Sequence, residues 1–185
     1  MTSRTPDLRD LSRLMLDDLA QVLSRVDPAQ VSPLIDHIAS ARRVFVCGAG
    51  RSGLVVRAFA QRLMQLGISV CVVGETTTPR ARPGDLLLAA SCTGERPTTL
   101  AIARQAKKAR VRVCALIGKP ASTLARIADL RVILHAPAVP RPRDPFLGAT
   151  LFEDSLLILL DAVAWLLSRR KGLSRRIGPR HANLE

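Results

Sequence analysis

Three glycines, an arginine and a serine share one short segment, GAGRSG at residues 48–53, between an apolar run and an amphipathic stretch. Glycines let backbone N–H groups approach an anion, and a helix that begins here adds the positive end of its dipole. The hydroxyl of Ser52 is placed to cap that helix and to bind a phosphate. A G-x-G-x-x-G pattern also suits a plain tight turn between a strand and a helix, so it leaves both interpretations open.

A dinucleotide site is a further interpretation of residues 48–53. Glu75 follows the second apolar run, 22 residues after Gly53, near the place where a ribose-binding acid is expected. Against this interpretation, the predicted sheet is too small for two mononucleotide-binding halves, and we expect no separate substrate domain. Glu75 and the threonines at 76–78 are equally compatible with a structural loop beside the crevice.

A second segment of the same character favours a small phosphate ester instead. LLLAASCTGERPTTL, at residues 86–100, predicts another strand that ends in a hydroxyl-rich turn and opens a helix. Gly94 offers backbone access, and four side chains offer hydroxyls: Ser91, Thr93, Thr98 and Thr99. Hydroxyls beside a helix N-terminus suit the phosphate monoester of a small molecule.

The elements that must position these two segments form a repeating pattern. Short runs rich in Val, Ile and Leu predict strands at 44–47, 68–73, 85–90, 112–117 and 130–134. Helical periodicity predicts helices at 7–26, 33–40, 52–66, 97–109, 121–128 and 149–170.

This alternation predicts one α/β domain over residues 1–185, a three-layer αβα sandwich around a doubly wound parallel sheet. We expect five strands in the flavodoxin-like order 2-1-3-4-5, with an added N-terminal helix and a long C-terminal helix. In that order the first and third strands flank the switch point, so both polar segments face one crevice.

The composition limits the classes of function. Apolar residues make up 48% of the 185 residues, which is enough for a core in a domain of this size. The net charge of +13 suits either a nucleic-acid surface or arginines scattered over the whole surface. The spread of arginines along the chain and the lack of interleaved aromatic residues favour the second interpretation, so we expect no nucleic-acid partner.

The cysteines and the apolar runs indicate the cellular compartment in which the protein works. The four cysteines lack C-x-x-C spacing, and three of them lie inside apolar runs: Cys47, Cys71 and Cys114. Buried free thiols are typical of a reducing compartment. The first residues alternate charges with leucines, unlike a signal peptide. The longest apolar stretch, at 156–167, contains Asp161 and is too short to span a membrane. We therefore expect a cytoplasmic protein without membrane contact.

Several segments together resemble the SIS (sugar isomerase) domain family, and within it the 6-phospho-3-hexuloisomerases. The likeness covers nearly the whole chain and rests on GAGRSGLVVRAFAQRLMQLG (48–67), VVGETTTP (72–79), PGDLLLAAS (83–91), STLARIAD (122–129), LGATLFEDSLLILLDA (147–162) and RHANLE (180–185). The resemblance implies an isomerase that interconverts D-arabino-hex-3-ulose 6-phosphate and D-fructose 6-phosphate through an enediol, with neither metal nor redox cofactor. It also implies a homotetramer with active sites at subunit interfaces. The resemblance further implies a functional link to hexulose-phosphate synthase, in formaldehyde fixation by the ribulose monophosphate pathway or in pentose supply.

One segment departs from the family pattern. The family's second turn reads S-G-S-G-E-T, whereas this chain has SCTGER at 91–96. Cys92 replaces a glycine, which matters if that position needs a positive φ or a close approach to the ligand. Arg96 replaces a threonine, and its guanidinium could clamp a phosphate with two hydrogen bonds. Three outcomes stay open: a retained isomerase, an isomerase of altered sugar-phosphate specificity, and a phosphosugar-binding protein without catalysis.

The implied reaction needs a base near C2 and C3 and a group that moves protons between the oxygens. Glu153, which matches the family's F-E-D segment, is the candidate base, although an acid at a helix start is also common for its effect on the dipole. His181 is the candidate shuttle, with a disordered tail as the alternative. His135 is a weaker candidate, and His37 is expected to be structural.

The other candidates hold the substrate. We predict eight such residues: Gly50, Arg51, Ser52, Ser91, Thr93, Gly94, Glu95 and Arg96. Arg51 could reach the phosphate or pair with an acid across a subunit interface, and Glu95 could orient a sugar hydroxyl or favour a helix N-terminus. The first and last helices carry more apolar surface than such a core covers, which predicts contacts between subunits.

Overall fold

The computed structural model describes residues 7–139, 145–170 and 183. These residues form one parallel sheet in the order β2-β1-β3-β4-β5. The strands are β1 (Val44–Gly48), β2 (Val70–Val72), β3 (Leu86–Ser91), β4 (Arg112–Ile117) and β5 (Leu130–Ile133). The predicted fold class and strand order are confirmed.

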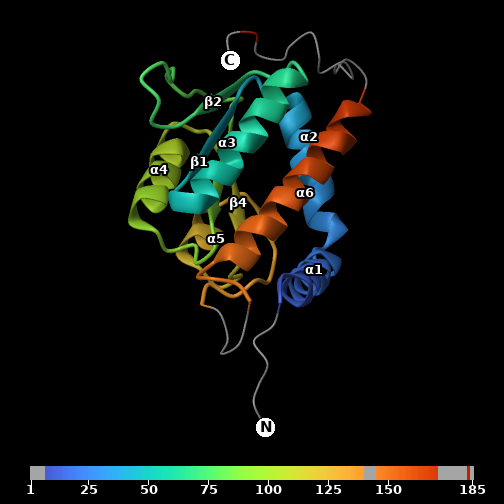
Figure 1. The fold of residues 1–185 in the computed structure, drawn as a ribbon. Coiled ribbons are helices and arrows are strands. Elements are labelled where there is room, and N and C mark those ends of the chain that lie inside the picture. Colours follow the sequence, from blue (N-terminus) through green and yellow to red (C-terminus); the bar gives the residue numbers. More distant parts are fainter. Residues whose placement is uncertain (1–6, 140–144, 171–182, 184–185) are drawn as a thin grey trace.

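Helices cover both faces of the sheet (Figure 1). On one face lie α1 (Leu8–Ser24), α2 (Pro28–Ser40), α3 (Gly50–Gln65) and α6 (Thr150–Ser168). On the other face lie α4 (Pro97–Lys108) and the short α5 (Thr123–Ile127). The helix α6 packs against α3, α2 and α1, so the last element of the fold closes the larger of the two cores.

The central strands are apolar along most of their length because both of their faces are covered. In β1, Val44 and Val46 point into the core beneath α6, whereas Phe45 and Cys47 point into the core beneath α4. All six residues of β3 are buried. The sheet is therefore held between two mainly aliphatic layers, to which the four phenylalanines of the chain also contribute.

The predicted start of the second helix was wrong. The second helix begins at Pro28, not at Pro33, and Pro33 lies inside it. The carboxylate of Asp27 caps this helix by accepting a hydrogen bond from the N–H of Ala29 at 2.8 Å. Pro28 then occupies the first helical position, where a missing N–H costs nothing. Among the helices of the described residues, none is long and apolar enough to cross a membrane.

Candidate active site

The turns after β1 and β3 lie next to each other at the carboxyl edge of the sheet. Gly48 pairs with Ala90 in the parallel register, so the two strands end together. A cavity of about 540 Å³ lies between these turns and the start of α6. Seven predicted site residues line it: Gly50, Arg51, Ser52, Ser91, Thr93, Arg96 and Glu153. The shared crevice predicted from the two polar segments is therefore present.

In the turn after β1, Gly50 and Gly53 need to be glycine for two different structural reasons. Gly50 has a φ of +57°, a left-handed conformation that favours glycine, and it turns the chain from β1 directly into α3. Gly53 lies so close to β1 that an added Cβ would meet the carbonyl oxygen of Gly48 at 2.6 Å. The prediction that Ser52 caps the helix was wrong. The helix α3 begins at Gly50, its N-cap is Ala49, and Ser52 lies within the first helical turn of α3.

Ser52 and Arg51 hold the carboxylate of Glu153. The Ser52 hydroxyl donates to Oε1 at 3.3 Å, and Arg51 Nε donates to Oε2 at 2.7 Å. Glu153 is 7% exposed and lies in the first turn of α6, as its sequence position predicts. A carboxylate has about four lone-pair sites, so both oxygens keep capacity for a proton. This geometry suits a positioned general base.

Arg51 also bridges to the neighbouring acid. Its Nη2 lies 3.5 Å from Asp154 Oδ1, so one guanidinium serves two carboxylates of its own chain. Burial raises the pKa of Asp154 above its ordinary value and the charge of Glu153 adds to this, while Arg51 opposes both. Arg51 thus pairs with two acids of its own subunit, whereas the expected pairing was across a subunit interface; its contact with the phosphate remains a prediction.

The second turn keeps hydroxyl protons available. Ser91 Oγ accepts from the N–H of Gly94 at 3.1 Å, and Thr93 Oγ1 accepts from the N–H of Glu95 at 3.2 Å. Both hydroxyls act as acceptors here, so each can donate its own proton to an anion. Ser52 differs, because its proton is directed at Glu153.

Gly94 has a structural role. Its φ is +67°, and an added Cβ would overlap the side chain of Ser122. Its N–H points back to Ser91, and its carbonyl oxygen accepts from the N–H of Leu124 at 3.0 Å. Gly94 lets the turn pack on the start of α5, and its N–H is already bonded within the turn.

Glu95 also contacts the start of α5. Its Oε1 accepts from the backbone N–H of Thr123 at 2.7 Å, and this hydrogen bond is the main cause that lowers its pKa, while Arg126 and Lys119 add to it by charge. Glu95 lies at a second cavity of about 860 Å³, which the first cavity adjoins through Thr93 and Arg96. Its expected contact with a sugar hydroxyl remains a prediction.

Arg96 borders both cavities. In the part of the chain that the structure describes, its guanidinium has no hydrogen-bond or ion-pair partner. Lys119 and His135 line the second cavity with it. Arg96 is therefore a free cation beside the two hydroxyls of the second turn.

Cys92 fits its position without a glycine's conformation. Its φ is not positive, and its thiol packs beside Gly118 and lies 3.8 Å from the carbonyl oxygen of Ala136. Burial, and then the charge of Glu153, raise the pKa of this thiol to about 12. Cys92 is a neutral thiol in the wall of the cavity, and the substitution does not strain the turn.

The remaining candidates lie elsewhere. His181 is outside the described residues. Glu75 pairs with Arg57 of α3, and His37 lies at the opposite edge of the sheet beside Arg112. Four cysteines are free, with Cys47, Cys92 and Cys114 buried and Cys71 partly buried. Within the described ranges, no cluster of three or more His, Cys, Asp or Glu side chains is arranged to hold a metal ion.

The comparisons with known proteins agree with this geometry. The model of the SIS domain matches residues 37–159, which include both turns and Glu153. The chain belongs to the SIS domain family. It is 40% identical over 187 residues to the 3-hexulose-6-phosphate isomerase of Mycobacterium gastri, covering 97% of this chain and 92% of that protein. It is 36% identical to the enzyme of the same name from Bacillus subtilis, covering 92% and 95%.

A solved structure has the same SIS fold. The Methanococcus jannaschii protein whose crystal structure infers a molecular function of 3-hexulose-6-phosphate isomerase is 34% identical, with a TM-score of 0.80. The match covers 96% of this chain and 98% of that one.

Sequence reasoning missed three parts of this SIS site. Asp154 shares Arg51 with the candidate base, Ser122 excludes a side chain at position 94, and Lys119 lines the second cavity. Lys119 could have been found, because it follows β4 directly, at the carboxyl edge where open α/β sheets bind ligands. The contacts of Asp154 and Ser122 carry no such local signal.

Proposed function

We propose that the protein interconverts D-arabino-hex-3-ulose 6-phosphate and D-fructose 6-phosphate through a 2,3-enediol. The observation that carries the proposal is the carboxylate of Glu153, held by Ser52 and Arg51 at a cavity whose other wall is a hydroxyl-rich turn. Relatives at 36–40% identity over most of their length are named for this reaction, which supports the choice of sugar.

Glu153 is proposed as the base that moves the carbon-bound proton. It removes the proton from C2 of the 3-ulose, leaving the enediol, and returns a proton to C3, so the carbonyl moves from C3 to C2. The proton exchange between the two oxygens is assigned to His181, with His135 at the second cavity as the alternative. No electron leaves the substrate, so the overall reaction needs no redox partner.

The phosphate is proposed to lie at the second turn. Ser91 and Thr93 have hydroxyl protons to donate, and Arg96 offers a guanidinium without an acidic partner among the described residues. The first residues of α3, Gly50 and its neighbours, line the same cavity, and N–H groups at a helix start attract anions. Ser52 contributes through Glu153, because its proton is already used there.

Assembly and cellular role belong to the same proposal. Apolar side chains stay exposed on α6 (Leu157, Ile158, Trp165 and Leu166) and on α1 (Leu8, Leu14 and Leu16). Faces of this kind support a homotetramer. We further propose a cytoplasmic enzyme that works with hexulose-phosphate synthase in formaldehyde fixation or pentose supply.

The departures in the second turn motivate one alternative, a phosphosugar-binding protein without catalysis. The test is to supply ribulose 5-phosphate, formaldehyde and hexulose-phosphate synthase, and to measure fructose 6-phosphate with and without this protein. We expect product to form with the wild-type chain and to fall to background with Glu153→Gln. Binding of fructose 6-phosphate by calorimetry without product in this assay would instead support the alternative.

A further inference from the structure

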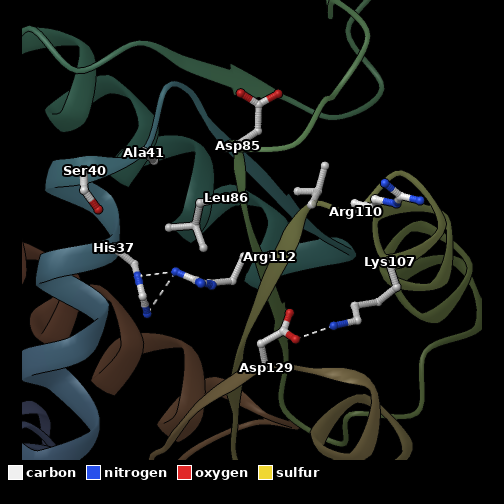
Figure 2. Close-up of a pocket in the computed structure, with 11 residues that line it drawn as sticks. His37, Ser40, Ala41, Asp85, Leu86, Lys107, Arg110, Arg112 and Asp129 are labelled. Carbon is white, nitrogen blue, oxygen red and sulfur yellow. Dashed lines mark hydrogen bonds and ion pairs between the residues drawn. The ribbon is translucent and has the colours of Figure 1, made fainter.

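The opposite, amino edge of the sheet carries another cavity. It has a volume of about 530 Å³ and lies among α2, the starts of β3 and β4, and the end of α4 (Figure 2). Leu86 lines it, whereas Ser91, at the other end of the same strand, lines the candidate active site. The length of β3 separates the two by roughly 16 Å, at about 3.3 Å per residue. A ligand here would therefore be distinct from the sugar phosphate.

Positive charge is in excess at this edge. Five cationic side chains line the cavity or contact its carboxylates: Arg42, Arg43, Lys107, Arg110 and Arg112. Two carboxylates face them, those of Asp85 and Asp129. Five cations against two carboxylates leave a net charge of +3.

Both carboxylates already have cationic partners. Asp85 accepts from Arg42 at 2.9 Å and lies 3.9 Å from Arg43 Nε. Asp129 pairs with Lys107 (Figure 2). It also accepts a hydrogen bond from the N–H of Val113. Partial burial opposes the resulting shift, yet these hydrogen bonds and the charges of Lys107 and Arg112 lower the pKa of Asp129. Each acid is therefore already paired with another cation, and neither forms an ion pair with the two remaining guanidinium groups.

Arg110 is the first of these groups. In Figure 2 its guanidinium lies beside the cavity, and it has no acidic partner among residues 7–139 and 145–170. Its backbone closes α4 at a φ of +56°, with its N–H bonded to Lys107 and the N–H of Val111 bonded to Ala106. Glycine is the usual residue at this position of a helix end, so the fold alone does not explain an arginine.

Arg112 is the second group. It reaches across the cavity to α2, where its Nη1 lies 2.8 Å from Nδ1 of His37 (Figure 2). A neutral imidazole nitrogen can accept this hydrogen bond, but it does not neutralise the guanidinium. The C-terminal ends of α2 and α4 point to this edge, and each contributes only about half a negative charge. Their effect is smaller than the excess of +3.

We propose that this cavity is a second binding site, for a small phosphate-bearing anion of two or more negative charges, held by Arg110 and Arg112. Guanidinium groups match the oxygens of a phosphate with paired hydrogen bonds. The volume lies within the range of small-molecule sites. The two guanidinium groups without an acidic partner, the net charge and the volume all point to the same class of ligand.

The test compares Arg110→Gly with the wild-type full-length chain. Glycine accepts the positive φ, so this variant should melt at the same temperature as the wild type or higher. Inorganic pyrophosphate is titrated by calorimetry at constant ionic strength. We expect the Kd to rise about tenfold or more, as for a lost charge-assisted hydrogen bond. Pyrophosphate bound at the candidate active site contributes to both titrations, so a two-site fit assigns the difference in Kd to this cavity.

Arg104→Ala is the matched control, since Arg104 is an exposed arginine of α4 outside this cavity. Its Kd should stay within about twofold of the wild type, as for an exposed charge. Equal losses in the two variants, or unchanged binding in Arg110→Gly, would overturn the proposal. Citrate at the same ionic strength should bind more weakly than pyrophosphate, and equal binding would overturn the phosphate class.

Discussion

At the carboxyl edge of the sheet most polar side chains hold one another, whereas at the amino edge two guanidinium groups border a cavity without an ion pair to either of its carboxylates. Glu153 has partners on both oxygens, and Ser91 and Thr93 accept from the backbone of their own turn. Arg110 has no such partner among the described residues. Side chains that hydrogen bonds hold in place, as at the carboxyl edge, suit a reaction that needs fixed geometry, whereas an unpaired charge suits binding alone.

Replacement of the candidate base should have the largest effect. Glu153→Gln keeps the shape and the acceptor for Ser52 but removes the basicity, so kcat should fall by about 10²–10⁴-fold with KM little changed. Asp154→Asn is the control, because this neighbouring acid shares Arg51 but lies outside the cavity lining. Similar kcat losses in both variants would mean that charge at the start of α6, and not a base, is what matters.

Two glycines, one at each edge, separate packing from backbone strain. At position 94 the backbone φ is +67°, and an alanine Cβ would overlap the side chain of Ser122. At position 84 the backbone φ is +88°, and an alanine Cβ would have no heavy atom within 4 Å. Both variants should lose about 1–2 kcal/mol of unfolding free energy from the backbone alone. Gly94→Ala should lose about 1–3 kcal/mol more from overlap. Urea denaturation measures this difference, and equal losses would remove the packing role of Gly94.

Two serines of the candidate active site should act on different kinetic constants. Ser52→Ala frees one oxygen of Glu153 and should lower kcat by about tenfold, the effect of one hydrogen bond. Ser91→Ala should raise KM for the sugar phosphate with a smaller change in kcat. Steady-state kinetics give kcat and KM for both variants and test these expectations. A rise in KM for Ser52→Ala would instead indicate that the hydroxyl of Ser52 binds the phosphate.

Glu95 should give the smallest effect, visible only in its pH dependence. Its pKa is lowered in the folded state, so its contribution to stability is present above its ordinary pKa and is lost as pH falls through the folded value. The melting temperature of the wild type should exceed that of Glu95→Gln by a constant amount near neutrality. This difference should shrink below about pH 4. A difference that does not change with pH would exclude the carboxylate as its source.

Much of the fold could be predicted because its signals are local. Apolar runs located all five strands, and periodicity located the helices, apart from the start of α2, where two prolines competed for the first helical position. The alternation of strands and helices predicted a parallel sheet with helices on both faces, and the order 2-1-3-4-5 is one of the common orders of such sheets.

The contacts within the site could not be predicted in the same way. Ser52 and Glu153 are 101 residues apart, and their hydrogen bond depends on how α6 packs against α3. The sequence therefore placed both residues at the same crevice but not in contact. The partner of Arg51 was open for the same reason, and the family resemblance supplied the choice of Glu153 over other acids.

The late position of α6 has a consequence for synthesis of the protein on the ribosome. At about 5–20 residues per second, Glu153 is added roughly 5–20 s after Ser52. During that interval α3 and the other four strands join α2 and β1, which are already made, but the helix that covers their shared apolar face is still missing. The nascent chain must keep this aliphatic surface from other chains until α6 arrives. The same helix then completes the core and delivers the candidate base, so an incomplete chain has neither.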